Sequence, residues 1–585
     1  METRRVAAGH PDWLSMTSFF VRSRGLQAKR SVVNALHRIP LLSEGAVEDF
    51  PHILAESESK LRTSTDSGER PLMLGKIQNL RVACRRIHCR VLTPEGTFSF
   101  WRQIGPPWRL NGFVLGREVR EGCVIPTSGG GLCQLSGSLL EVALALDLDI
   151  LERHRHTALP FDAPSDIHRD ATLFWNYVDL RFRSRVPLFF ECFLTRTALV
   201  VRLRGKRPRA ASLRVGPCNV EKPAAVPRSL VKSCLTCQQA ACSRHVTESL
   251  KGAKATFLLD DYQPEFAKFV RDHIKDGDRL FLPFFSPGGW TKSAIEAAND
   301  VQFCSWFRLR RSLALRWSVF RGVTVAKAHF NLAGVLARHY EQQIGHEVEH
   351  LCLTQTLLPY LWRAGVLGGR TFDVLMQRLP VASLEQHLET AARLYPQSKT
   401  LVEFRAPRWF AEAEQQALKA VRTIFTPHKQ IAALYDRAAC LPWEAPPPRR
   451  NKSLRQRDLL VFMGPTLARK GAYAVREAVK KTGLSITVLG PELEEPGFWH
   501  NLPVVRSNAS ELPWERIHTV VQPALFEYWP RQLLRAHAAG ANLVVSPLCG
   551  LEEDRAAGIH HVPFGDVDTL AATLGRLVTD QGDFP

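Results

Sequence analysis

Three consecutive glycines, Gly129 to Gly131, are the feature of this sequence that most restricts how it can fold. Glycine has no β-carbon, so such a run permits tight turns and positive φ angles that other residues avoid. The residues that follow, from Leu135 to Leu146, are almost all apolar and predict a largely buried helix. Cys133 lies between the glycines and this run. We therefore expect its thiol at, or just before, the N-terminus of the helix.

Cys133 and the histidines that follow it suggest a nucleophilic site. The unpaired N–H groups and positive dipole at a helix N-terminus lower the pKa of a thiol. The next segment, Leu151 to His156, predicts a strand whose two-residue period places Glu152, His154 and His156 on one face. A thiol at a helix start with a histidine on the next strand is an arrangement used in nucleophilic catalysis. The alternative is a buried structural cysteine beside surface histidines.

A further strand is predicted over Asp170 to Phe182, which alternates and is rich in aromatic and β-branched residues. A carboxylate on this strand would orient the catalytic histidine, as a triad requires. We expect Asp170 in this role because it lies at the start of the strand, with Asp179 as the alternative.

The segment from about Leu72 to Leu203 resembles the VanW-like family. The matching motifs are Asn79-Leu80-Arg81, Gly96 to Trp101, the GGGLCQLS run, Glu152 to Thr157, and Arg169 to Thr172 followed by Asn176 to Leu180. The activity of this family is not established, so the resemblance implies membership and little about function. The family's name does not imply antibiotic resistance for this chain.

The charge of the chain favours anionic partners. It has 77 basic and 57 acidic residues, a formal net charge of +20 and a pI near 9.6. Such a balance attracts nucleotides and other anionic small molecules, or an acidic membrane surface contacted peripherally. Nucleic acid is disfavoured because no nucleic-acid-binding motif is present. No signal segment or long apolar run is found, and 13 cysteines suit a reducing compartment, so we expect a cytoplasmic protein.

The pattern predicts an α/β multidomain protein in five segments. These are a basic helical lead-in (1–70), an α+β VanW-like domain (71–215), a cysteine-rich connector (216–250), and two lobes (251–445 and 446–585). We expect the lead-in helix to pack on the domain that follows it, with docking on a membrane surface as the alternative. The VanW-like domain is expected to end in a hairpin over Pro187–Leu194 and Ala198–Leu203.

The connector has the spacing of a metal site. A CxxC pair is followed closely by CxxH, and the candidate ligands are Cys218, Cys234, Cys237, Cys242 and His245. Tetrahedral Zn²⁺ takes four sulfur or nitrogen ligands, so either Cys218 or His245 would be spare. An iron–sulfur cluster or unligated thiols are the alternatives to zinc.

From about Ala253 onward the chain alternates between predicted strands and helices. In the second lobe, the expected strands are Leu459–Met463, Ser485–Leu489, Thr519–Val521 and Asn542–Val545. In the first lobe, they include Ala255–Leu259, Arg279–Leu282 and Thr400–Phe404. The pattern in the second lobe predicts a Rossmann-like parallel sheet, whose ligands bind beyond the carboxyl ends of the strands.

From about Ala253 to Val578 the chain also resembles the two-lobed, retaining GT-B glycosyltransferases that use nucleotide-sugars. The motifs that carry this resemblance are Phe462 to Gly464, Arg469 to Gly471, Gln522 to Pro530, and Ala536 to Gly540 before Leu543 to Ser546. The resemblance implies a nucleotide-sugar donor bound by Gly464, Arg469, Lys470, Gly471, Glu527 and Tyr528. It also implies that Glu527 lies next to the donor sugar and takes part in catalysis.

Two positions depart from the GT-B pattern, and they leave the function open. Pro465 stands where the family has an arginine, and Arg535 stands where it has a second glutamate. One hypothesis is a transferase that glycosylates a cell-envelope or metabolite precursor, with the VanW-like domain binding or processing the same substrate. A second is a non-catalytic ligand-binding or assembly protein. A third is a Cys133-dependent acyl or amide enzyme with a degenerate glycosyltransferase lobe.

Overall fold

The computed structural model describes residues 21–22, 24–32, 39–62, 67–120, 123–155, 170–208, 213–214, 254–284, 295, 298, 300–304, 306–307, 309–313, 325–402, 405–446, 457–507 and 514–579. The chain forms two compact units. The first comprises Met1–Lys254, Ile344–Glu349 and Ala364–Thr371. The second comprises Ala255–Gln343, His350–Arg363 and Phe372–Pro585.

The first unit is built on a largely antiparallel sheet in the order β1-β3-β9-β10-β2-β11. Its strands are β1 (Ser43–Glu44), β2 (His52–Lys60), β3 (Arg90–Leu92), β9 (Leu188–Leu194), β10 (Ala198–Gly205) and β11 (Leu213–Arg214). β9 and β10 pair as an antiparallel hairpin, which confirms the hairpin predicted for this region. Two smaller pieces accompany the sheet, the three strands β4 (Thr97–Ser99), β8 (Arg181–Arg183) and β7 (Asp149–Glu152), and the hairpin β5 (Leu115–Arg120) and β6 (Cys123–Ser128).

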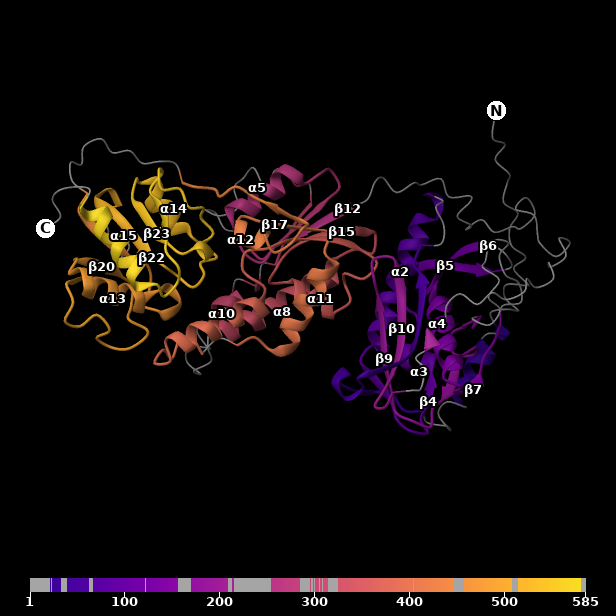
Figure 1. Ribbon diagram of the computed structural model, residues 1–585. Helices are drawn as coiled ribbons and strands as arrows, with labels where there is room; N and C mark the ends of the chain where they lie inside the picture. Colours follow the sequence, from indigo (N-terminus) through magenta and orange to yellow (C-terminus); the bar gives the residue numbers. More distant parts are fainter. Residues whose placement is uncertain are drawn as a thin grey trace, which may run out of the picture. The chain divides into compact units, whose positions relative to one another are not determined.

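Two helices pack on this sheet (Figure 1). Helix α2 (Arg70–Ile87) lies against β9, and α4 (Leu132–Ala145) lies against β2 and β10. The short α3 (Phe100–Ile104) follows β4. Apolar side chains of both long helices, such as Ile77 and Leu139, are fully buried in the same core as the inner face of the sheet. The apolar run after the glycines is therefore the helix that the sequence predicts.

The strand predicted over Asp170 to Phe182 was wrong. The chain turns in this region, with an isolated β-bridge between Phe174 and Val178, and only β8 continues as a strand. Asn176 explains the turn because it adopts a left-handed backbone with φ of 59°, and asparagine tolerates this conformation better than most residues. Likewise β7 ends at Glu152, so the predicted strand from Leu151 to His156 is shorter and begins earlier.

The lead-in segment is helical over residues 21–22 and 24–32 and contacts the rest of the first unit. The side-chain amide of Asn176 donates to the Gln27 carbonyl at 3.2 Å and to the Ser31 hydroxyl at 2.8 Å. The Arg30 guanidinium forms an ion pair with Glu152. These contacts favour the packed helix that we expect over the membrane-docking alternative.

The first lobe of the second unit contains a sheet in the order β14-β13-β12-β15-β16-β17-β18. The strands are β12 (Lys254–Leu258), β13 (Arg279–Leu282), β14 (Asp300–Phe303), β15 (Val348–Thr354), β16 (Thr371–Leu375), β17 (Thr423–Thr426) and β18 (Ala438–Cys440). Its helices are α5 (Pro264–His273), α8 (Val325–Gln343), α9 (Leu358–Arg363), α10 (Val381–Leu394), α11 (Arg408–Ala420) and α12 (Lys429–Ala432). The strand predicted at Thr400–Phe404 was wrong because its described part, 400–402, is a turn.

The second lobe has a six-stranded sheet in the order β21-β20-β19-β22-β23-β24, in which every neighbouring pair is parallel. Its strands are β19 (Leu459–Phe462), β20 (Ile486–Leu489), β21 (Val504–Ser507), β22 (Ile517–Gln522), β23 (Asn542–Val545) and β24 (Ile559–His561). The helices are α13 (Ala472–Thr482), α14 (Arg531–Ala538) and α15 (Val567–Thr579) (Figure 1). This confirms the Rossmann-like sheet, and the central strands are buried throughout, as in other parallel sheets.

In the described part of the chain, we find no helix with both the length and the apolar character needed to cross a bilayer.

Candidate functional site

Cys133 is the second residue of α4, as the sequence predicts. The helix begins after Gly131, which adopts a left-handed backbone with φ of 98° and gives no side-chain cap. The Cys133 side chain is half-buried and packs against the core of the first unit. Among the described residues, neither its thiol nor its backbone N–H has a hydrogen-bond partner.

His154 lies beyond the end of β7 and faces a carboxylate rather than the thiol. Its Nε2 is 3.4 Å from Glu152 Oε1, and its side chain is half-exposed. The His154 carbonyl accepts a hydrogen bond from the Thr172 N–H at 2.9 Å. Within the described ranges, no hydrogen bond joins His154 to Cys133. The other candidate histidine, His156, lies outside the described residues, so the thiol–histidine pair stays a prediction.

Asp179 has a structural role in the first unit. Its buried carboxylate accepts hydrogen bonds from the Ser99 hydroxyl at 2.6 Å, the Trp101 N–H at 3.1 Å and Arg181 Nε at 2.8 Å. It therefore ties β4, α3 and β8 together, and its oxygens are committed to these contacts. For Asp170, the structure shows its carbonyl accepting from Arg153 Nε at 3.1 Å, and its role as the orienting group stays a prediction.

The second lobe contains a topological switch point next to β19. Strands β20 and β21 continue the sheet on one side of β19, whereas β22 to β24 continue it on the other. In open parallel sheets, ligands bind outside the carboxyl ends of the strands at such a point. Two loops leave the sheet there, Gly464 to Gly471 after β19 and Pro523 to Pro530 after β22. These loops hold all the residues predicted to bind the donor.

The loop after β19 depends on Gly471. This residue has φ of 86°, and a β-carbon on it would lie 2.5 Å from the Pro523 carbonyl oxygen. Only glycine therefore lets the two loops approach this closely. The Leu525 N–H donates to the Arg469 carbonyl at 2.7 Å and fixes the loops to each other. Gly464 also has positive φ, at 100°, where the chain leaves β19.

Glu527 and Lys470 meet across this junction. Lys470 Nζ forms an ion pair with Glu527 Oε2. The same carboxylate accepts hydrogen bonds from Gln522 Nε2 at 2.8 Å and from the Trp529 N–H at 3.1 Å. The Glu527 side chain is 10% exposed and that of Lys470 is 21% exposed. The structure thus brings together two residues that lie 57 positions apart and that the GT-B resemblance places in one site.

A pocket lies at this edge of the second lobe and is completed by the first lobe of the same unit. Its lining residues are Arg378, Leu379, His428, Gln430 and Ile431 from the first lobe, and Phe526, Glu527, Tyr528 and Leu548 from the second. His428 Nε2–H donates to the Tyr528 carbonyl at 3.3 Å. Burial lowers the pKa of His428 to about 4. At neutral pH the pocket therefore contains an uncharged imidazole beside the Glu527 carboxylate.

Sequence reasoning missed His428 and Glu494. His428 directly follows Thr426-Pro427 after β17, and a histidine at the carboxyl end of a parallel strand was the available signal. Glu494 gives no signal in the sequence. Its carboxylate accepts from the Ala468 N–H at 2.6 Å and from the Ser398 hydroxyl at 2.7 Å, so it joins the loop after β19 to the first lobe.

The two residues that depart from the GT-B pattern, Arg535 and Pro465, lie in different surroundings. Arg535 lies on α14, is exposed, and stacks over the Trp514 ring at 4.4 Å from its centroid. It therefore does not line the pocket. Pro465 follows Gly464 where the loop leaves β19, and it supplies no cation there. The half-buried Arg469 remains the neighbouring cation, and its guanidinium has no hydrogen bond or ion pair within the described ranges.

Part of the first unit matches a known protein family. Residues 75–204 match the family model described as VanW like protein. The chain carries a VanW-like domain. This domain contains α2, the glycine loop, α4 and the β9–β10 hairpin, so it includes Cys133, His154 and Asp179.

Two curated proteins are similar to the VanW-like domain. The vancomycin B-type resistance protein VanW of Enterococcus faecalis is 29% identical over 149 residues, which are 25% of this chain and 54% of that protein. The Bacillus subtilis protein YoaR is 32% identical over 108 residues, which are 18% of this chain and 35% of that protein. The chain thus spans about half the length, or less, of the curated relatives it matches.

Solved structures similar to this chain include glycosyltransferases. A sucrose-phosphate synthase from Thermosynechococcus elongatus is 10% identical, covers 56% of this chain and 90% of its own, and has a TM-score of 0.37. WaaG, a glycosyltransferase involved in lipopolysaccharide biosynthesis, is 15% identical with the same coverage and a TM-score of 0.33. The description of two parallel-sheet lobes rests on the strand orders given above.

The predicted zinc ligands, Cys218, Cys234, Cys237, Cys242 and His245, lie outside the described residues. Within the described ranges, no group of three or more histidine, cysteine or acidic side chains is arranged to hold a metal ion. The zinc site in the connector therefore stays a prediction.

Proposed function

We propose that the second unit is a glycosyltransferase that binds a nucleotide-sugar donor at the switch point of its second lobe. The observation that carries this proposal is the convergence of Lys470 and Glu527 from the two loops that flank the switch point. A cation in a loop before a helix suits a diphosphate, and a buried carboxylate suits a hydroxyl group of a sugar. Glu527 lines the pocket at this edge of the second lobe, and Lys470 forms an ion pair with it.

The reaction would transfer a sugar from the donor to an acceptor oxygen. The bond between the anomeric carbon and the diphosphate breaks, a bond to the acceptor oxygen forms, and the proton of the acceptor hydroxyl passes to the departing diphosphate. Negative charge develops on the departing diphosphate, and Lys470 would stabilise it. To do so, the ammonium must leave Glu527, whose carboxylate would keep Gln522 and the Trp529 N–H as partners. We further propose that the acceptor is a cell-envelope or metabolite precursor that the VanW-like domain also binds or processes.

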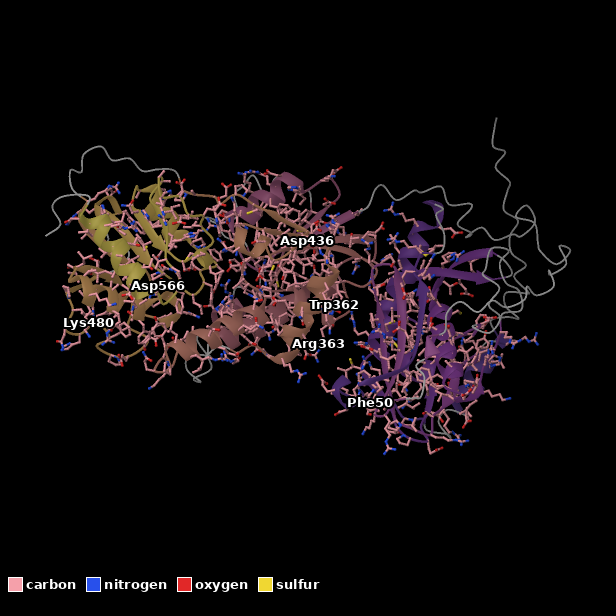
Figure 2. All side chains as sticks on the ribbon, viewed as in Figure 1. Phe50, Trp362, Arg363, Asp436, Lys480 and Asp566 are labelled. Atoms are coloured by element: carbon pink, nitrogen blue, oxygen red, sulfur yellow. The ribbon has the colours of Figure 1, made fainter. Side chains whose placement is uncertain are left out.

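Calorimetry with the common nucleoside diphosphates tests this proposal. Lys470→Ala is expected to weaken binding by roughly 1–3 kcal/mol, the scale for losing a charge-assisted hydrogen bond. Lys480→Ala is the matched control because Lys480 lies on α13, eight residues after Ala472 at its start, and is exposed at the edge of the second lobe (Figure 2). Absence of binding at millimolar nucleotide would overturn the donor site and favour a non-catalytic scaffold.

A further inference from the structure

Lys76 is a buried lysine for which the described part of the chain supplies no partner. It lies on α2, is 6% exposed, and forms no hydrogen bond or ion pair with the residues that the structure describes. Burying an ammonium group without a counter-charge is unfavourable, so such groups are normally paired or become neutral. Burial, and second the nearby charge of Arg117, lower the pKa of Lys76 to about 8. An apolar residue would fill this position at lower cost, so the lysine calls for an explanation.

The Lys76 side chain lies across the start of α4. A β-carbon placed on Gly131 would be 2.3 Å from Lys76 Cγ and 3.2 Å from its Cδ. Gly131 is the N-cap of a 14-residue helix and supplies no capping side chain. The first N–H groups of a helix lack partners within it and attract anions. Here the Cys133 N–H is without an acceptor among the described residues.

The charges around Lys76 leave an excess of positive charge. Arg117 on β5 is the neighbouring cation. Its Nε lies 3.2 Å from Glu69 Oε2, so Arg117 has a carboxylate beside it, whereas Lys76 has none among the described residues. An oxyanion bound beside Lys76 would supply the missing negative charge.

Glycines hold the walls of this site in backbone contact. A β-carbon on Gly75 would lie 1.9 Å from the Leu115 carbonyl oxygen, and one on Gly116 would lie 2.4 Å from that of Gly130. Asn79 fixes the same loop, since its amide donates to the Gly130 carbonyl at 2.9 Å. Helix α2, strand β5 and the glycine loop are thus locked together before any ligand arrives. This arrangement is expected of a preorganised binding site.

We propose that Lys76 and the N-terminus of α4 bind an oxyanion of the VanW-like domain's substrate, beside the Cys133 thiol. The recognised group is a carboxylate or a phosphate, because both place acceptor oxygens against an ammonium and the Cys133 N–H. This site is independent of the donor site in the second unit, so neither proposal depends on the other.

Hydrogen exchange of the full chain, read by mass spectrometry on peptides that cover the start of α4, tests the site. Acetate and inorganic phosphate are titrated separately at constant ionic strength, with chloride as the balancing salt. Binding slows exchange of the first-turn amides by the factor 1 + [L]/Kd, which is about threefold at twice the Kd. Protection by acetate identifies a carboxylate ligand, and protection by phosphate identifies a phosphate ligand.

Variants separate a binding site from a structural lysine. Lys76→Met is expected to abolish the protection, whereas the exposed Lys206→Met on the same unit is expected to keep it. Arg117→Gln, which keeps Lys76, is expected to reduce the affinity severalfold and serves if Lys76→Met does not fold. Protection that persists in Lys76→Met, that chloride produces equally, or that neither anion produces below about 100 mM would overturn the proposal.

Discussion

Helices α4 and α13 begin in the same way but present their lysines differently. Each starts after a glycine in the left-handed region, Gly131 with φ of 98° and Gly471 with φ of 86°. At α13 the preceding Lys470 is ion-paired with Glu527. At α4 the lysine comes from another helix, and Lys76 has no partner among the described residues. To bind an anionic ligand, Lys470 must give up its ion pair with Glu527. Lys76 would instead gain a counter-ion that it lacks among the described residues.

The largest expected effect is on the free energy of unfolding when Gly471 or Gly131 is replaced by alanine. Gly471→Ala is expected to cost roughly 4 kcal/mol of unfolding free energy, the sum of left-handed strain and a clash with the Pro523 backbone. Gly131→Ala is expected to cost less, roughly 2–3 kcal/mol, because it adds the same left-handed strain but meets Cβ and Cγ of the Lys76 side chain rather than backbone atoms. Urea denaturation followed by hydrogen exchange in each unit measures both values. Equal losses of unfolding free energy in Gly471→Ala and Gly131→Ala would contradict this difference between the two helix starts.

The pH dependence of stability sharpens the contrast between the lysines. Burial lowers the pKa of Lys76 from 10.5 to about 8. Between these values the unfolded chain holds the proton and the folded chain does not, so stability rises with pH across this window. The gain relative to Lys76→Met is expected to reach roughly 3 kcal/mol at the alkaline end. Parallel curves for the wild type and Lys76→Met would contradict an unpaired buried lysine.

Sequence patterns predicted the helices and strands whose apolar residues recur at a regular local spacing. The helix that contains Leu135 and Leu139, and the parallel strands of the second lobe, followed from apolar spacing alone. The strand expected from Asp170 onward failed because a left-handed residue, Asn176, turns the chain within an aromatic-rich segment. The spacing of residues in the sequence does not show where a residue will adopt a left-handed backbone.

The candidate site residues show the same contrast between local sequence patterns and contacts made far along the chain. Lys470 and Glu527 were found because motifs carry them, and the structure brings them into contact. Lys76 and Glu494 were missed because their significance comes from residues far away in the chain. For Lys76 it is the approach to Gly131, and for Glu494 it is the reach to Ser398 in the other lobe.

The smallest expected effect concerns Cys133, which distinguishes α4 from α13, where Tyr473 occupies the second position. Cys84 and Cys192 in the same unit are fully buried, and burial raises the pKa of both thiols. We therefore expect iodoacetamide to label Cys133 at least about tenfold faster than either, because the thiolate is the reacting form. His154→Ala is expected to change the Cys133 rate less than about twofold, since the imidazole faces Glu152. Peptide mass spectrometry over a time course measures each rate.

A large slowing in His154→Ala would establish the thiol–histidine pair, whereas slowing only in His156→Ala would assign the partner to the other histidine. If neither histidine matters and Cys133 labels as slowly as Cys84, the cysteine is structural, and the oxyanion site at α4 would serve binding alone.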